Sequence, residues 1–165
     1  MFSGVLMPSE RVICVKCSHF SHPCDAACPA TAGFKIITIY PDEHGMPDYE
    51  AIKAAANEHT AAIFMTNPED IGIYNIHADK IVEAIHAVGG LCFYDQANAN
   101  AFLGIARARE AGFDMCHFNV HKTFGTPHGG EGPASGAFGF TSGGLSPACS
   151  TAEVKILGPC CGLTE

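Results

Sequence analysis

Short apolar runs rich in β-branched residues alternate along the chain with segments of helical spacing. Strands are predicted at residues 11–16, 34–40, 60–65, 91–94, 113–118 and 137–140. Helices are predicted at residues 25–32, 49–57, 76–88 and 97–103. Strands that alternate with helices are typical of a mostly parallel sheet with flanking helices. The sequence therefore predicts an α/β fold.

Cap and turn residues set several of these boundaries. Asp48 precedes the second helix and is a suitable N-cap. Pro68 ends the strand that leads into Thr66, because proline cannot donate to a strand ladder and disfavours helix before it. The third helix has apolar residues at helical spacing and is followed by Gly89, which suits a helix end.

The chain is long enough for one domain with its own core, since a domain of this size buries roughly 70% of the surface of its unfolded chain. Residues 1–140 are predicted to form that domain, with a glycine-rich loop near its end. Residues 141–165 are rich in Ser, Gly, Pro and Cys. No element is predicted in that tail.

Composition and charge exclude several classes of protein. Hydrophobic residues make up 47% of the chain and charged residues 16%, which is too apolar for a disordered protein. The net charge of -8 offers no basic surface for nucleic acid. The apolar runs are shorter than the roughly 20 residues of a membrane helix, and the N-terminus lacks a basic leader. A cytoplasmic protein without membrane or nucleic-acid partners is expected.

The chain contains nine cysteines, an odd number that argues for reduced thiols over a disulfide framework. A zinc site near the N-terminus is one interpretation of this composition. The other is that these cysteines pack as small apolar side chains on a strand and a helix, which is the interpretation adopted, so no metal ligand is assigned. The residues in question are Cys14, Cys17, His19, His22, Cys24 and Cys28.

Polar residues follow three of the predicted strands. Thr66 follows the third, Asp95 the fourth, and Asn119 to Lys122 the fifth. In open parallel sheets, ligands bind outside the carboxyl ends of the strands. Because one helix and one strand separate Asp95 from Lys122, we expect the two side chains to face each other across one crevice.

A lysine opposite a buried carboxylate suits pyridoxal phosphate. The amine forms an imine with the cofactor aldehyde, and the carboxylate keeps the pyridine nitrogen protonated so that the ring withdraws electrons. Lys122 and Asp95 fit these roles. Each also has an ordinary alternative, because loop lysines are usually solvated and an aspartate after a strand often caps a helix.

Two stretches carry a more specific resemblance. Residues 91–139, LCFYDQANANAFLGIARAREAGFDMCHFNVHKTFGTPHGGEGPASGAFG, closely resemble the P-protein of the glycine cleavage system, glycine dehydrogenase (decarboxylating), in its separate second-subunit form. Residues 65–75, MTNPEDIGIYN, resemble the same family's TNP segment. The resemblance runs from about residue 22 to residue 140, and HFNVHKTFGTPHGG is its most specific part.

This resemblance implies the large domain of a fold-type I pyridoxal-phosphate-dependent transferase, present in incomplete form. It implies that Lys122 forms the imine and that Asp95 is the partner of the pyridinium. Ala97 would lie against the ring, and His22 would stack on its other face. The sequence at His22 reads His-Pro-Cys-Asp where the family usually has His-Gly-Thr-Asn, which leaves a core or surface histidine as an alternative.

Further site residues follow from the same resemblance. Thr66 corresponds to a residue near the cofactor or the substrate carboxylate, and Asn119 and His121 are candidates for phosphate or neighbouring contacts. His128 lies in the glycine-rich loop and either contacts the site or braces the loop. Two arginines could steer an anionic ligand, although loop arginines are more often solvated: Arg107 and Arg109.

The implied function is glycine decarboxylation with transfer of the aminomethyl group to lipoylated H-protein, in a hetero-oligomer with a companion P-protein subunit. The chain is expected to be a fragment, without the family's upstream glycine-rich phosphate turn or its downstream small domain. One alternative is another fold-type I enzyme, such as an amino-acid decarboxylase or a desulfurase. The other is a non-catalytic remnant that serves as an interface or metal-binding module.

Overall fold

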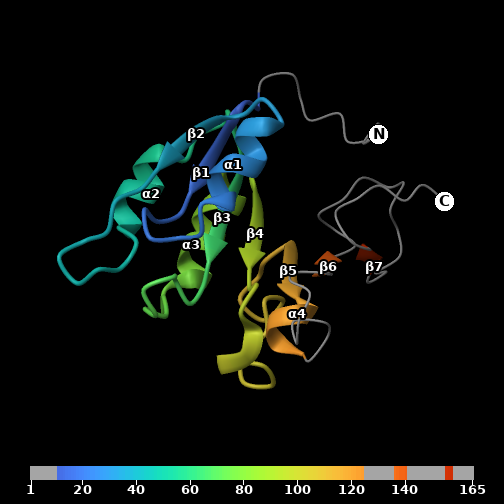
Figure 1. The fold of residues 1–165 in the computed structure, drawn as a ribbon. Coiled ribbons are helices and arrows are strands. Elements are labelled where there is room, and N and C mark those ends of the chain that lie inside the picture. The colour runs from blue at the N-terminus through green and yellow to red at the C-terminus, as the bar shows by residue number, and fades with distance from the viewer. Residues whose placement is uncertain (1–10, 125–135, 141–154, 158–165) are drawn as a thin grey trace.

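The computed structural model describes residues 11–124, 136–140 and 155–157. Seven strands in these ranges form one sheet in the order β2-β1-β3-β4-β5-β6-β7 (Figure 1). The first five pair in parallel, whereas β6 and β7 are antiparallel to their neighbours. The strands are β1 (Ile13–Lys16), β2 (Lys35–Thr38), β3 (Thr60–Thr66), β4 (Leu91–Asp95), β5 (Met115–Asn119), β6 (Gly136–Phe140) and β7 (Lys155–Leu157).

Helices connect the parallel strands, so the predicted α/β fold with a mostly parallel sheet is confirmed. The Asp48 carboxylate accepts a hydrogen bond from the backbone N–H of Ala51 at 3.1 Å, as an N-cap should. Gly89 follows the third helix with a φ of 75°, a conformation that glycine adopts readily. The helices are α1 (Cys24–Thr31), α2 (Tyr49–Ala55), α3 (Ala78–Ala87), a single 3-10 turn η1 (Ala99–Ala101) and the short α4 (Val120–Thr123).

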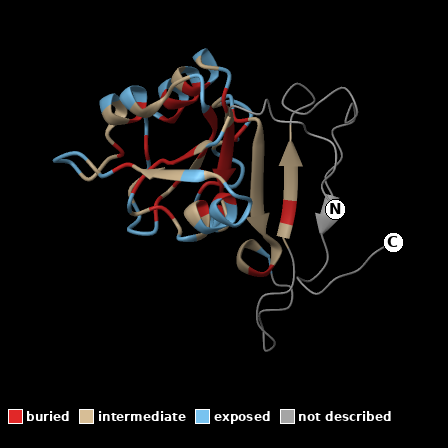
Figure 2. Ribbon diagram, turned by 90° about the horizontal axis from the view of Figure 1, so that it is seen from above, coloured by how far each residue is buried: buried red, intermediate tan, exposed pale blue. Residues whose placement is uncertain are grey.

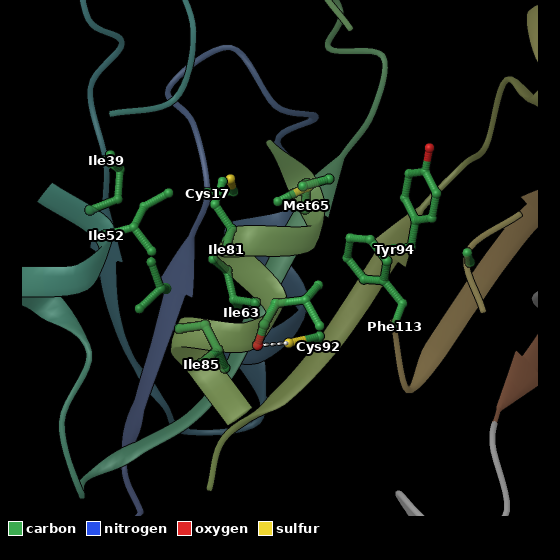
Figure 3. Packing of buried hydrophobic residues seen from close by; sticks show 14 residues of the cluster. Cys17, Ile39, Ile52, Ile63, Met65, Ile81, Ile85, Cys92, Tyr94 and Phe113 are labelled. Atoms are coloured by element: carbon green, nitrogen blue, oxygen red, sulfur yellow. Dashed lines mark hydrogen bonds between the residues drawn. The ribbon is translucent and has the colours of Figure 1, made fainter. Parts of the chain in front are cut away.

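The main core lies between the central strands and α3. Alternate residues of a strand point to opposite faces of the sheet, and Val15 and Ile63 join Ile81 and Ile85 of α3 in this core (Figure 3). All four are fully buried. Cys14, Ala61 and Ala62 form a smaller buried cluster. This packing fixes the carboxyl ends of β3 and β4 beside each other.

Burial falls toward the β5 and β6 side of the sheet (Figure 2). Every residue of β5 is of intermediate burial, and Ala137 is the buried residue of β6. Within the described part of the chain, no helix has the length and apolar character needed to span a bilayer.

Two expectations differ from the structure. The helix predicted at residues 97–103 is only the 3-10 turn η1, because Asn98 makes no capping side-chain hydrogen bond and Gly104 follows with a φ of 83°. In the predicted tail, where the sequence indicates no element, β7 pairs with β6. The proposed division at residue 140 stays a prediction.

Candidate functional site

The sheet brings the predicted strand-end residues together. Thr66 ends β3 and Asp95 ends β4, and the two are directly paired in the parallel ladder. Asp95 is likewise paired with His117 of β5. The chain then turns into α4, which carries His121 and Lys122. Three adjacent strands thus deliver polar side chains to one edge, as their order along the chain predicts.

A cleft of about 410 Å³ lies at this edge. Its lining contains five of the predicted site residues, so Asp95 and Lys122 do border a common space. A second, more open cleft of about 490 Å³ adjoins it and is lined by Asn98, Asn100, Ala101, His121 and Lys122. The predicted residues that line the first cleft are His22, Thr66, Asp95, Ala97 and Lys122.

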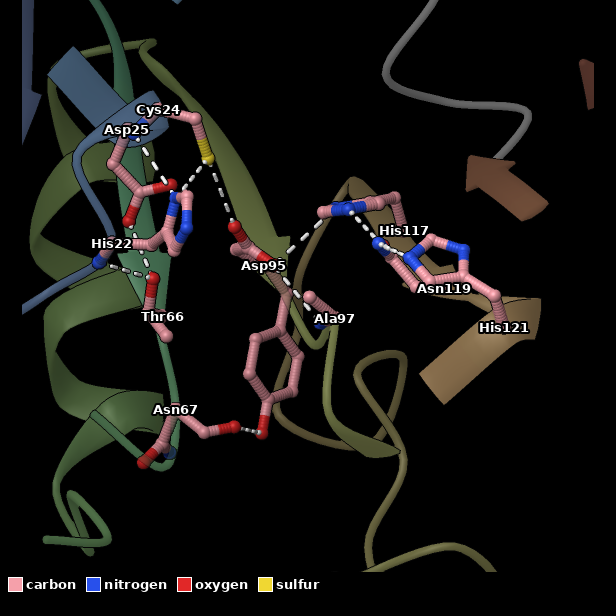
Figure 4. A network of polar contacts seen from close by, with 11 residues as sticks. His22, Cys24, Asp25, Thr66, Asn67, Asp95, Ala97, His117, Asn119 and His121 are labelled. Carbon is pink, nitrogen blue, oxygen red and sulfur yellow. Dashed lines mark hydrogen bonds and ion pairs between the residues drawn. The ribbon is translucent and has the colours of Figure 1, made fainter. Parts of the chain in front are cut away.

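Asp95 is buried at the floor of the cleft and held on both carboxylate oxygens (Figure 4). Its Oδ1 accepts a hydrogen bond from the backbone N–H of Ala97 at 2.9 Å and lies 3.4 Å from His117 Nδ1. Its Oδ2 accepts from the Cys24 thiol at 3.4 Å. The carboxylate is therefore oriented by the strand-end turn and by α1.

His22 is tied to β3 and to the start of α1. Its backbone N–H donates to Thr66 Oγ1 at 3.1 Å, and Thr66 Oγ1 in turn donates to Asp25 Oδ2 at 2.8 Å. The His22 ring nitrogen Nδ1 lies 2.8 Å from the Cys24 sulfur and accepts from the Cys24 backbone N–H at 3.1 Å. Thr66 therefore positions His22.

Burial makes ionisation costly beneath the cleft. Burial, and then the charge of Asp95, raises the pKa of Asp25 to about 7. Burial, and then the charges of Asp95 and Asp25, raises the pKa of the Cys24 thiol well above its ordinary range. Cys24 is thus a neutral hydrogen-bond donor at neutral pH, although it stands 2.8 Å from an imidazole.

A second set of polar side chains, linked by hydrogen bonds, lies on the other side of Asp95. Asn119 Oδ1 lies 3.0 Å from His117 Nε2, and Asn119 Nδ2 lies 3.1 Å from His121 Nε2. His117 and Asn119 are two residues apart on β5 and therefore share one face. Asn119 braces the two histidines and is not among the residues that line either cleft, whereas His121 lines the more open one.

Backbone carbonyls hold the loops around the cleft. Asn100 Nδ2 donates to the Lys122 carbonyl at 2.9 Å, which ties η1 to α4. The Tyr94 hydroxyl donates to the Asn67 carbonyl at 2.7 Å, and the Asn67 side chain exchanges hydrogen bonds with the backbone of Asn75. These contacts stabilise the shape of the cleft from below.

The remaining sequence candidates lie elsewhere or outside the described ranges. Arg107 is exposed and pairs with Glu110 at 3.4 Å, and Arg109 is also exposed. Neither arginine lines either cleft. His128 lies outside the described residues. Of the N-terminal cysteines, Cys14 and Cys17 are buried in the two core clusters.

The sequence did not indicate Asp25 or His117 as site residues, and it indicated Cys24 only through the zinc interpretation that was not adopted. A signal existed for His117, because it precedes the predicted Asn119 by two residues on a strand. The contact between Cys24 and Asp95 and that between Asp25 and Thr66 had no local signal, since the partners are 71 and 41 residues apart in the sequence.

Comparison with curated proteins identifies relatives of this chain. The chain is 46% identical over 121 residues to the probable glycine dehydrogenase (decarboxylating) subunit 2 of Halobacterium salinarum, covering 73% of this chain and 26% of that protein. The subunit 2 of Caldanaerobacter subterraneus is 42% identical over 130 residues, covering 79% and 26%. That of Thermococcus onnurineus is 47% identical over 119 residues, covering 72% and 24%. No family model matches the chain.

These identities confirm the resemblance to the second-subunit form of the P-protein. The chain spans about a quarter of the length of these P-protein subunits.

Solved structures bear out the fold. A pyridoxal-phosphate-dependent aminotransferase from Streptococcus suis matches 70% of the chain with a TM-score of 0.59 at 15% identity, over 32% of its own length. A cysteine desulfurase from Escherichia coli matches 67% of the chain with a TM-score of 0.56 at 18% identity, over 28% of its own length. The P-protein-like chain therefore has part of the aminotransferase-like fold.

Proposed function

We propose that this chain is the cofactor-binding part of a pyridoxal-phosphate-dependent glycine decarboxylase of the P-protein type. The observation that carries this proposal is that Lys122 and the buried Asp95 line one cleft at the carboxyl ends of β3 to β5. The relatives that share the sequence are named glycine dehydrogenase (decarboxylating) subunit 2.

The residues of the cleft fit the proposed cofactor. Asp95 Oδ2 has a thiol at 3.4 Å as its neighbour, and the carboxylate can accept a stronger hydrogen bond from a protonated ring nitrogen. Ala97 offers a small side chain beside Asp95, which suits a flat ring. The volume of about 410 Å³ is within the range of roughly 300 to 1,000 Å³ found for small-molecule sites.

Each cleft residue then has a defined task. Lys122 would hold the cofactor through its Nζ, and its free amine would carry protons at the reacting centre. Asp95 would hold a proton on the ring nitrogen, while Ala97 and His22 would flank the ring. When bound, the cofactor supplies an electron-withdrawing ring that stabilises the carbanion left by loss of carbon dioxide. Thr66 positions His22 through the 3.1 Å hydrogen bond to its backbone.

Asn119 and His121 are proposed to support the phosphate side of the cofactor. His121 lines the more open cleft together with Lys122, and Asn119 braces His121 at 3.1 Å. An imidazole next to a lysine is a suitable partner for an anion.

The proposed partners follow from the same function. The substrate is glycine, and the aminomethyl group passes to lipoylated H-protein. The name subunit 2 of the relatives supports a hetero-oligomer with a companion P-protein subunit. The cytoplasmic location expected from the sequence stays a prediction.

The cofactor site is tested by titrating the purified chain with pyridoxal phosphate and recording the visible absorbance. We expect a saturable band that borohydride fixes to Lys122, identified by peptide mass mapping. Lys122→Ala should lose the band. The matched control is Lys80→Ala, which removes an exposed lysine of α3 and should leave the band unchanged.

Two results would contradict the cofactor site. One is a band that persists in Lys122→Ala, since the cofactor would then be bound to another amine. The other is the absence of any saturable band, even at cofactor concentrations high enough to form imines with the exposed lysines.

The choice of glycine is tested separately. The cofactor-loaded chain, with companion subunit and lipoylated H-protein present, should release labelled carbon dioxide from carboxyl-labelled glycine. Release of sulfur from cysteine in place of carbon dioxide from glycine would favour the desulfurase alternative. Lys122→Ala serves as the inactive control in both assays.

A further inference from the structure

We propose that His22, Cys24 and Asp95 form a binding site for a thiophilic divalent cation such as Zn²⁺, on the wall of the cleft. The Cys24 sulfur lies 2.8 Å from His22 Nδ1 and 3.4 Å from Asp95 Oδ2. One ligand atom from each residue lies within 4.8 Å of the other two. An imidazole, a thiol and a carboxylate thus converge on one point from α1, the loop before it and β4 (Figure 4).

These separations are close to what zinc requires. With metal bonds of about 2.0 Å to nitrogen and oxygen and about 2.3 Å to sulfur, the ligands of a tetrahedral site lie roughly 3.5 Å apart. The 2.8 Å and 3.4 Å contacts reach that geometry through side-chain shifts of about 1 Å or less. His22 and Asp95 both line the cleft, so the fourth position would face it and take a water molecule.

The donor set also suits the charge and chemistry of zinc. A thiolate and a carboxylate together offset the two positive charges of the ion, and binding releases the Cys24 proton to solvent. His22 Nδ1 accepts a hydrogen bond from the Cys24 backbone N–H at 3.1 Å. A metal bond to this nitrogen would replace that weaker contact. Asp95 Oδ1 keeps its hydrogen bond from Ala97, which orients the carboxylate as a ligand.

A second group of similar composition, His86, Cys92 and Asp114, is a weaker candidate among the described residues. There, Asp114 Oδ2 already accepts from the Cys92 backbone N–H at 2.7 Å and lies 2.8 Å from His86 Nε2. The Cys92 side chain is fully buried, and its sulfur contacts the Val82 carbonyl. This group does not border either cleft.

The metal site would compete with the cofactor. Both the ion and the protonated ring nitrogen require the Asp95 carboxylate, so binding of one excludes the other. This competition, unlike the metal site itself, rests on the proposed cofactor function. The competition depends on Cys24, because this residue supplies the thiolate among the three ligands.

The metal site is tested with the reduced full chain, free of cofactor, titrated with Co²⁺ as a spectroscopic substitute for Zn²⁺. We expect one equivalent of Co²⁺ to give a thiolate charge-transfer band that Zn²⁺ abolishes. Cys24→Ser should lose the band, and His22→Gln should weaken Co²⁺ binding at least tenfold. Cys28→Ser, which removes an exposed thiol from the same helix, and His86→Gln should both retain it.

Thiol protection in the wild-type chain provides a readout that needs no variant. One equivalent of Zn²⁺ should shield Cys24 from alkylation, as located by peptide mapping, while Cys28 stays reactive. Protection of Cys92 instead, or a Co²⁺ band that survives Cys24→Ser or is lost in His86→Gln, would overturn the proposal. So would the absence of any thiolate band at one equivalent.

The competition is measured with the visible cofactor band. Zn²⁺ should lower the apparent affinity for pyridoxal phosphate at least tenfold in the wild type but not in Cys24→Ser. A chain that binds Co²⁺ through Cys24 and shows no cofactor band would uphold the metal site and contradict the proposed function alone. A cofactor band without thiolate-bound Co²⁺ would do the reverse.

Discussion

At the scale of single residues, the candidate site depends on Asp95, which lines the cleft with Lys122 and accepts a hydrogen bond from the Cys24 thiol at 3.4 Å. Asp95 and Lys122 were predicted to face one crevice because each follows a strand, and both line the same cleft. Cys24 reaches Asp95 across 71 residues of sequence. No local periodicity encodes such a contact, which depends on how α1 lies over the sheet.

Asp25 should make stability depend on pH. Its pKa rises from 3.8 in the unfolded chain to about 7 in the fold, through burial first and the charge of Asp95 second. A carboxyl with a raised pKa favours the folded state below pH 4, and this contribution is lost as the pH rises toward 7. The loss is on the order of 4 kcal/mol. Asp25→Asn should flatten this dependence, as measured by urea unfolding at pH 5 and pH 8.

The amide in Asp25→Asn keeps an oxygen for the Thr66 hydroxyl, which now donates to Asp25 at 2.8 Å. The variant should therefore be more stable than the wild type at pH 8. Asp79→Asn, at an exposed position of α3, should keep the wild-type pH profile. Equal pH profiles for wild type and Asp25→Asn would show that this carboxyl ionises normally.

At the scale of elements, boundaries marked by a cap or a proline were predicted best. The helix after Asp48 and the strand before Pro68 begin or end within two residues of expectation. The predicted helix at residues 97–103 was wrong, since a short segment without a side-chain cap at Asn98 and with a positive-φ Gly104 after it forms only one 3-10 turn. β7 was missed because three residues give too little pattern to recognise.

The Asp48 cap should contribute measurably to the stability of the whole domain. Its carboxylate satisfies the Ala51 N–H, one of the four donors that a helix start leaves unpaired. Asp48→Ala should lower the free energy of unfolding by about 1 kcal/mol, as measured by urea denaturation. Asp48→Ser should recover most of this loss, because serine also caps. Equal stability of the alanine and serine variants would mean that the cap contributes nothing.

At the scale of the whole molecule, the described strands form one sheet with two adjoining clefts at its edge, and the chain spans about a quarter of the length of its relatives. β5, the strand that leads into Lys122, is only half-buried along its whole length. The sequence predicted the mostly parallel sheet because hydrophobic runs alternate with helices. It did not predict the exposure of β5, because exposure depends on what packs against a strand and not on the strand's own residues.

Ligand binding at this cleft should therefore stabilise the entire fold. A ligand that binds only the folded state at 100 times its Kd raises the free energy of unfolding by about 2.7 kcal/mol. Pyridoxal phosphate should shift the urea midpoint of the wild type upward, and both Lys122→Ala and Asp95→Asn should reduce the shift. Lys80→Ala should keep it.

Imines formed with lysines of the unfolded chain would weaken this stabilisation, so an analogue without the aldehyde provides the stricter comparison. Pyridoxine phosphate cannot form an imine, and its stabilising effect should depend on Asp95 but not on Lys122. An equal effect on wild type and Asp95→Asn would mean that the carboxylate does not bind the ring nitrogen. An effect that requires Asp95 alone would assign recognition to the carboxylate and attachment to the lysine, which is the division of tasks that the cleft supports.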